Sequence, residues 1–161
     1  IALGKKVWPI VEAGRPVINT DLTTVHVLPK VSEQNYEDAF YQMENFSAPK
    51  VKAWRITYKN FWGMNVISFT YAVSFQYGGS FENRGHYLTG VNVSASNVNV
   101  SWGFEFSANS SIVTISNRGT SEDPVASVTL KINYVAKSVI SELSSSRKFH
   151  LTGKGEFTRS L

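Results

Sequence analysis

The longest regular pattern in the chain is an alternation of large apolar residues with small, mildly polar ones. Every second residue from Ile67 to Tyr77 is apolar, and serine, threonine, alanine and glutamine lie between them. Successive side chains of a strand point to opposite faces, so the pattern predicts one β-strand with an apolar and a mildly polar face. The mildly polar face carries no charge. We therefore expect a second sheet, another subunit, a ligand or a lipid to cover it.

The same alternation recurs in shorter segments after Pro49. It predicts strands near residues 51–58, 65–77, 86–95, 98–106, 112–116, 128–134 and 147–159, after an earlier one at 23–28. We expect turns at residues 59–63, 78–85 and 96–97, and a short helix or a loop at 137–145. Because no helical crossovers separate the strands, the sheets should be antiparallel. The sequence predicts a mainly β fold, an antiparallel two-sheet β-sandwich of jelly-roll type with about eight strands. A sheet closed on itself is the alternative.

One segment has helical spacing instead. Ser32 is a suitable N-cap, and Tyr36, Phe40 and Met43 recur on one side of the following turns. This pattern predicts a helix over residues 32–44 (33–44 without its cap) that packs on the sheet. Before it, residues 1–30 are expected to be extended and interrupted by prolines, which suit loops or edge strands.

Length and composition predict one globular domain over residues 1–161. The chain is 42% hydrophobic and 13% aromatic, which suits a packed core. Its net charge is +4, although residues 33–44 hold four acids and no base. The remaining positive surplus can attract an anionic membrane surface. We expect no nucleic-acid partner, because the sequence lacks clustered bases with interleaved stacking aromatics.

The absence of cysteine removes disulfides and thiolate metal sites from consideration. No apolar run approaches about 18 residues, so we expect no membrane-spanning helix. Abundant serine, threonine and asparagine beside long aromatic strands favour an exported protein, either secreted or periplasmic.

The sequence contains little that predicts catalysis. His26, His86 and His150 lie far apart, and no phosphate-binding or dinucleotide motif is present. We therefore expect no metal, no cofactor and no enzymatic activity. A glycosidase would need two facing carboxylates, and Glu105 and Glu156 are the only acids inside predicted strands. Both are read more simply as charges that face solvent.

Two aromatic and polar segments flank the long strand and are the candidate ligand-binding sites. Phe61 and Trp62 lie before it. The second group follows it and comprises Phe81, Asn83, Arg84, His86 and Tyr87. Amphipathic aromatic side chains stack on sugars or enter membrane interfaces, and polar neighbours orient the ligand. The alternative is that these aromatic residues cap the ends of the sandwich. Because the two groups lie at opposite ends of one strand, they cannot easily form a single site. Of the two, we favour the longer segment 81–87.

These features predict a non-catalytic binding module that recognises a glycan or a protein surface through its loops. The alternative is a membrane-active, pore-forming-like or self-assembling β-protein that uses uncharged amphipathic strands. Residues 66–77, 91–95 and 98–101 have the alternating, uncharged pattern that this alternative requires. Because exposed strand surfaces invite pairing, the sequence is also compatible with a homo-oligomer.

Overall fold

The computed structural model describes residues 2–8, 17–27 and 42–160. Seven strands from residue 50 onward form two antiparallel sheets, and two further strands precede them. The strands are β1 (Ala2–Trp8), β2 (Val17–Val27), β3 (Lys50–Lys59), β4 (Asn65–Phe81), β5 (Arg84–Val100), β6 (Phe104–Asn117), β7 (Ala126–Ser138), β8 (Glu142–Thr152) and β9 (Phe157–Ser160). The sequence-based estimate of about eight strands is thus corrected to seven in the two sheets.

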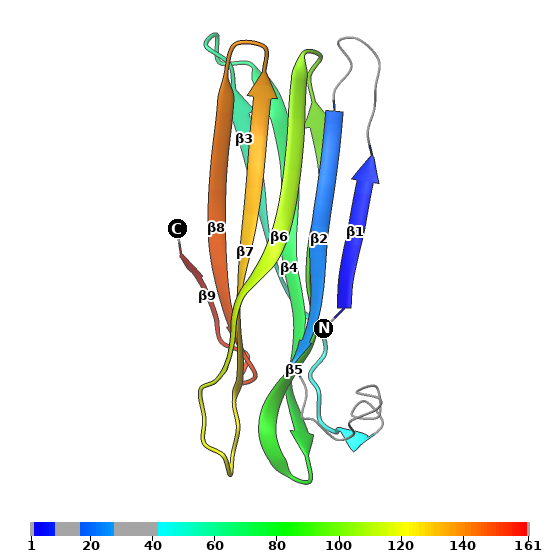
Figure 1. Ribbon diagram of the computed structural model, residues 1–161, viewed down its shortest axis with the longest axis vertical. Coiled ribbons are helices and arrows are strands. Elements are labelled where there is room, and N and C mark those ends of the chain that lie inside the picture. The colour runs from blue at the N-terminus through cyan, green and yellow to red at the C-terminus, as the bar shows by residue number, and fades with distance from the viewer. Residues whose placement is uncertain (1, 9–16, 28–41, 161) are drawn as a thin grey trace.

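The two sheets are simple meanders that run along the long axis of the molecule (Figure 1). β3, β4 and β5 form one sheet, and β6, β7, β8 and β9 form the other. β2 lies between them, with residues 24–27 antiparallel to β5 and residues 17–21 parallel to β6. β1 pairs antiparallel with residues 18–24 of β2. The mainly antiparallel β prediction is confirmed, and the fold is sandwich-like. The jelly-roll prediction is wrong for the described strands, because consecutive strands within each sheet are direct neighbours and no Greek-key crossover separates them.

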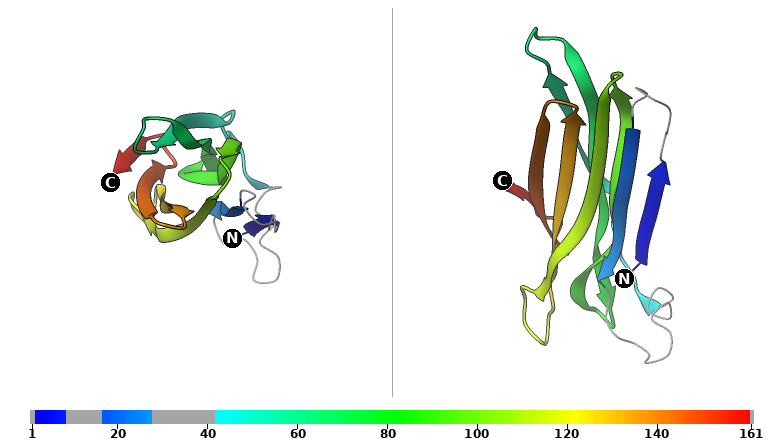
Figure 2. Two further views of the ribbon diagram at one scale, coloured as in Figure 1. Left: turned by 90° about the horizontal axis from the view of Figure 1, so that it is seen from above. Right: turned by 45° about the horizontal axis from the view of Figure 1, so that its top comes forward.

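The apolar face of β4 forms the centre of the core. Ile67, Phe69, Tyr71, Val73 and Phe75 are all at most 1% exposed, as their alternation predicts. They pack against buried apolar residues of β5, β6, β7 and β8. When the molecule is viewed along its long axis, these strands and β4 curve around a common centre (Figure 2).

The mildly polar face of β4 points outward and is covered in part by the chain itself. Ser68 is buried, and its hydroxyl accepts a hydrogen bond of 3.0 Å from the Arg55 guanidinium on the neighbouring strand. The Gln76 side-chain amide donates to the carbonyl of Ser47, at 2.9 Å. A long cationic side chain and a loop therefore provide part of the cover expected for this face.

The outer edges of the two sheets, β3 and β9, meet along a seam. In the described strands no ladder joins β3 to β8 or β9, so the sheet does not close on itself. The Trp54 ring lies across the seam, 5.6 Å from the Phe157 ring, and the Arg159 guanidinium lies 5.3 Å above it. Lower down, the Lys50 ammonium donates to the carbonyl of Gly155, at 2.7 Å. Side chains rather than backbone hydrogen bonds thus hold the two edges together.

The predicted boundary between the third and fourth segments after Pro49, 86–95 and 98–106, is wrong. Residues 96–97 do not form a turn, because β5 continues to Val100 with a register shift against β4 in this region. Asn97 has a φ of 51°, so the turn-favouring pair forms an irregularity within a strand. The turn lies at residues 101–103, so the predicted strand 98–106 is divided between β5 and β6, and β6 continues through the predicted strand 112–116.

Glycines and asparagines account for two other corrections. β4 extends through the predicted loop to Phe81, and only Glu82 and Asn83 form the turn, both with positive φ. The predicted strand 147–159 is a hairpin, because the chain turns at residues 153–156, where Gly155 has a φ of 85°.

The predicted helix over residues 33–44 lies mostly outside the described residues. In its described remainder Gln42 is helical, and Glu44 forms an isolated bridge with Ser80. The ambiguous segment 137–145 is resolved as the end of β7, a turn at 139–141 and the start of β8. The prolines of the predicted extended segment 1–30 also lie outside the described residues.

Candidate functional site

Exposed apolar side chains gather at one end of the molecule. Seven of the ten large hydrophobic residues that are exposed in the described chain lie on three turns, or next to them, at this end. The turns are residues 60–64, 101–103 and 139–141, at the upper end of Figure 1. We call these turns, together with Leu143, the apolar tip. Its exposed side chains are Phe61, Trp62, Met64, Trp102, Val139, Ile140 and Leu143.

The turn between β3 and β4 holds its two aromatic residues away from the core. The Asn60 side-chain oxygen accepts hydrogen bonds from the backbone N–H groups of Trp62 and Met64, each at 3.0 Å. Gly63 has a φ of 80°, which a residue with a Cβ adopts only with strain. Phe61 and Trp62 are 95% and 79% exposed, and their rings contact each other edge to face at 5.9 Å. The turn is therefore fixed by its own polar groups.

Serine side chains stabilise the turn between β7 and β8 in a similar way. Its backbone is closed by a 2.7 Å hydrogen bond from the Ser138 N–H to the Ser141 carbonyl. The Ser138 hydroxyl also accepts from the Ser141 N–H, at 3.2 Å. These bonds leave Val139 and Ile140 at the point of the turn, 97% and 95% exposed. The backbone groups of these turns are hydrogen-bonded within the turns. Their apolar side chains can therefore move from water into an apolar environment without burying many unpaired backbone groups.

A pocket of about 480 Å³ lies behind the tip, between the β3–β4 and β7–β8 turns. Ile67, Phe104 and Ala136 from three strands form part of its wall, so the pocket is the end of the space between the sheets. Tyr58, Phe61 and Leu143 also line it. Its volume falls within the range of small-molecule sites, about 300–1,000 Å³.

Charge is distributed unequally between the two ends. The tip itself has no Asp, Glu, Lys or Arg. From residue 42 onward, two acids, Glu105 and Glu142, lie between the middle of the molecule and the tip. Seven bases lie in the same region: Arg55, Lys59, Lys131, Lys137, Arg147, Lys148 and Arg159. Toward the opposite end, five bases and five acids balance each other. An uncharged tip is thus followed by a cationic half of the molecule.

The favoured segment, residues 81–87, lies at the opposite end from Phe61 and Trp62, as expected. Phe81 is half-buried, Asn83 is exposed in the two-residue hairpin turn, and Arg84 is exposed at the start of β5. The Tyr87 ring packs over Gly85, and burial raises the pKa of its hydroxyl. The structure therefore does not bring the two predicted groups into one site.

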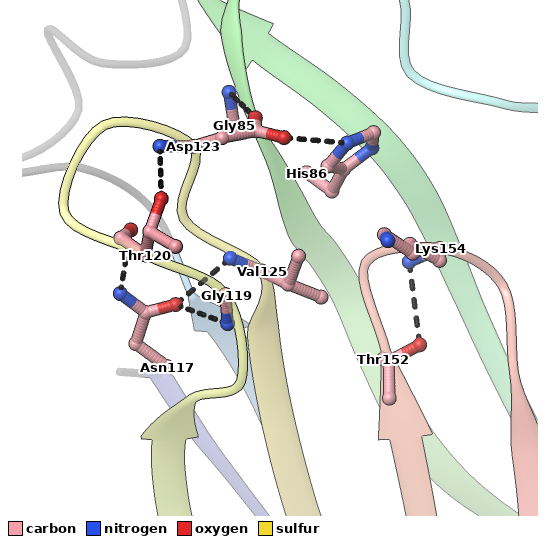
Figure 3. A network of polar contacts seen from close by, with 9 residues as sticks. All are labelled: Gly85, His86, Asn117, Gly119, Thr120, Asp123, Val125, Thr152 and Lys154. Carbon is pink, nitrogen blue, oxygen red and sulfur yellow. Dashed lines mark hydrogen bonds and ion pairs between the residues drawn. The ribbon is translucent and has the colours of Figure 1, made fainter.

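The lower segment is tied to the loop between β6 and β7 (Figure 3). Asp123 accepts a hydrogen bond from the Gly85 N–H at 3.0 Å, and its other carboxylate oxygen lies 3.7 Å from Nε2 of His86. The His86 N–H donates to the carbonyl of Pro124, at 2.7 Å. Asn117 organises the same loop by accepting from the N–H groups of Gly119 and Val125, each at 2.9 Å. These contacts give His86 a structural role.

The two acids considered for glycoside hydrolysis do not face each other. Glu105 is exposed on β6 near the tip, with Lys137 as its cross-strand neighbour. Glu156 lies in the β8–β9 turn at the other end, where Oε2 is 3.9 Å from the Arg118 guanidinium. The prediction that Glu156 lies inside a strand is therefore wrong. Within the described residues, no three His, Asp or Glu side chains are grouped closely enough to hold a metal ion.

Sequence reasoning identified Phe61 and Trp62 but missed the other two turns of the tip. Trp102 was assigned to a strand, although Gly103 follows it and has a φ of 83°. Val139 and Ile140 lie between two serines, and an uncharged apolar pair at a turn was the available signal. Helices long and apolar enough to cross a membrane are absent from the described chain. In comparisons with protein-family models, curated proteins and solved structures, no match to this chain was found.

Proposed function

We propose that the protein is a non-catalytic, exported binding module that docks on a lipid membrane through its apolar tip. The supporting observation is the concentration of exposed Trp, Phe, Met, Ile, Leu and Val side chains on three uncharged turns at one end of an elongated molecule. Contiguous exposed apolar groups of this kind mark interaction sites. Tryptophan in particular favours the membrane–water interface, because its ring is apolar and its N–H is polar.

The size of the tip favours a membrane over a protein partner. About a dozen residues form it, whereas a standard protein interface has about 20–30 residues on each side. Three narrow turns are well suited to enter between lipid headgroups. A second copy of the chain would gain too little buried surface from a contact between two tips to form a stable dimer.

Apolar burial is expected to outweigh electrostatic attraction. Burying a side chain such as Phe61, Trp62 or Ile140 contributes about 1.5–3 kcal/mol, against an association cost of about 4–15 kcal/mol. Several tip residues must therefore enter the membrane together to offset the association cost. Lys59 and Lys137 lie close to the tip, but Glu105 and Glu142 lie at similar depth and offset them. The remaining bases are several residues away at about 3.3 Å per residue, beyond or near the screening length of about 10 Å.

The test is cosedimentation with neutral phosphatidylcholine vesicles and with vesicles that contain anionic lipid. We expect binding to both, with a modest increase on anionic vesicles that high salt removes. Trp62→Ser and Ile140→Ser should each weaken binding by about tenfold or more, because each removes one inserted side chain. Val113→Ser is the matched control, since Val113 is 43% exposed on β6 away from the tip.

Two outcomes would contradict the proposal. The first is the absence of vesicle binding by the unaltered protein. The second is equal binding by the tip variants and the Val113→Ser control. A glycan array run in parallel tests the module predicted from the sequence, and capture of a glycan without vesicle binding would restore that prediction. The alternative of inserting amphipathic strands differs as well, because it requires the fully buried apolar face of β4 to leave the core.

A further inference from the structure

The pocket behind the apolar tip, here called the tip pocket, exists because the inward-facing side chains of β7 become small near the tip. In chain order these side chains are Val128, Leu130, Ile132, Tyr134, Ala136 and Ser138. The first four are at most 2% exposed and belong to the packed core. The short side chains of Ala136 and Ser138 instead line the pocket of about 480 Å³. Protein interiors are close-packed, and an empty space forfeits contacts, so an occupant is favoured there.

The tip pocket runs from the surface into the space between the sheets. Phe61 and Ile140 form part of its rim and are each 95% exposed. Ile67 and Ala136 form part of its floor and are 1% and 7% exposed. The floor residues lie on β4 and β7, which belong to opposite sheets. A ligand that enters at the tip therefore reaches the core without the separation of any paired strands.

Three of the polar side chains that line the tip pocket are hydrogen-bonded within their own turns. The Asn60 side-chain oxygen accepts from two backbone N–H groups. The hydroxyls of Ser138 and Ser141 form a hydrogen bond with each other, at 3.2 Å. Lys59 also lines the pocket, but it is exposed at the rim. Because apolar cavities bind apolar molecules rather than water, this wall selects a hydrocarbon ligand whose polar end stays at the rim.

We propose that the tip pocket holds one alkyl chain of a lipid, with the chain between the two sheets and the polar head group outside, beside Lys59. Ile67, Phe104 and Leu143 give the chain an apolar wall. The rim of the pocket belongs to the apolar tip, so its mouth is continuous with the proposed docking surface. Supply of the chain from a bilayer rests on the proposed membrane docking, whereas the capacity of the pocket for an alkyl chain does not.

Soluble alkyl probes test the pocket without membranes. Isothermal titration calorimetry of the full protein would use hexanol, octanol and decanol, and dodecylphosphocholine below its micelle-forming concentration. Each methylene added to the alkanol should raise the affinity about fourfold, because one more apolar group leaves water. The heat-capacity change of binding should be negative, which is characteristic of apolar burial. Dodecylphosphocholine should bind at least as tightly as decanol, because its head group remains at the rim.

Variants that fill the pocket should block the probes. Ala136→Leu places a larger side chain at the floor and should weaken decanol binding by about tenfold or more. Without ligand, this variant should unfold at the same temperature as the unaltered protein or a higher one, because its side chain occupies existing space. Leu143→Phe adds bulk at a residue that is 53% exposed and should weaken decanol binding in the same direction. Val113→Leu adds bulk on β6 away from the tip, and as the control it should leave decanol affinity unchanged.

Several results would overturn the inference. These are the absence of alkanol binding, an affinity that does not rise with chain length, or decanol affinities of both filling variants equal to that of the Val113→Leu control. Binding of alkanols without binding of dodecylphosphocholine would also overturn it, because the pocket would then take small apolar molecules in place of a lipid chain.

Failure of the pocket and failure of membrane docking are distinguishable. Trp102 belongs to the tip but does not line the pocket, so Trp102→Ser should weaken vesicle cosedimentation and leave decanol affinity intact. Ala136 is buried, so Ala136→Leu should have the reverse effect. Vesicle binding by a protein that binds no alkyl probe would leave docking standing and remove the lipid chain from the pocket.

Discussion

Replacing Trp54 with alanine tests whether side chains hold the two sheet edges together. The Trp54 ring lies 5.3 Å from Tyr71, 5.4 Å from Phe149 and 5.6 Å from Phe157, which belong to three different strands. No backbone ladder spans the seam among the described strands, so these contacts have no hydrogen-bonded substitute. Removal of the ring should separate β3 from β9.

The expected loss of stability can be derived from these contacts. Each aromatic pair contributes about 0.5–1.5 kcal/mol beyond its area, and replacing a fully buried tryptophan with alanine costs about 3–5 kcal/mol. Trp54 is only half-buried, so we expect its replacement to lower the free energy of unfolding by about 2–4 kcal/mol. The control is Trp102→Ala, because Trp102 is 66% exposed and its loss should cost less than about 0.5 kcal/mol.

Urea unfolding measures the free-energy change, and amide hydrogen exchange measures where the structure opens. β9 pairs with β8 at only four positions, so its amides should lose protection first in Trp54→Ala. A loss below about 1 kcal/mol, or a loss equal to that of Trp102→Ala, would refute the idea that the seam depends on this ring. Unchanged exchange in β9 would refute the local part of the reasoning.

Two further predictions concern packing and pH. Gly153→Ala should destabilise the protein by about 1–3 kcal/mol, because its Cβ would overlap the backbone of His86; unchanged urea unfolding would contradict this close approach. Burial raises the pKa of Tyr58, Tyr71 and Tyr87 in the folded state, whereas unfolded tyrosines ionise near pH 10. Stability from these groups should therefore be complete below about pH 10 and be lost as pH rises through their folded pKa values. Tyrosinate absorbance followed during alkaline titration checks this, and ionisation of all tyrosines near pH 10 in the folded protein would argue against it.

The fold class could be predicted because burial follows the strand period closely. The alternation from Ile67 to Tyr77 places every apolar residue up to Phe75 in the core, and the same holds for residues 128–134. The strand boundaries could not be predicted in the same way. Asn97 and Gly78 favour turns by composition, but both take positive φ inside strands that continue past them. Local conformational preference does not distinguish a turn from an irregularity in a ladder, which depends on the neighbouring strand.

The candidate site was predictable only in part. Phe61 and Trp62 stood out because asparagine and glycine flank them in a short turn. Trp102 and Ile140 become their neighbours only through the arrangement of strands, which no local pattern encodes.

The position of β2 between β5 and β6 has a consequence for synthesis on the ribosome. Val17 pairs with Glu105, so the chain must grow by roughly 90 residues after Val17 before this partner exists. At about 5–20 residues per second, the waiting time is roughly 4–18 s. During this interval β2 can form its hairpin with β1, but it cannot yet join both meanders. β2 therefore becomes fully paired only after β6 has been translated.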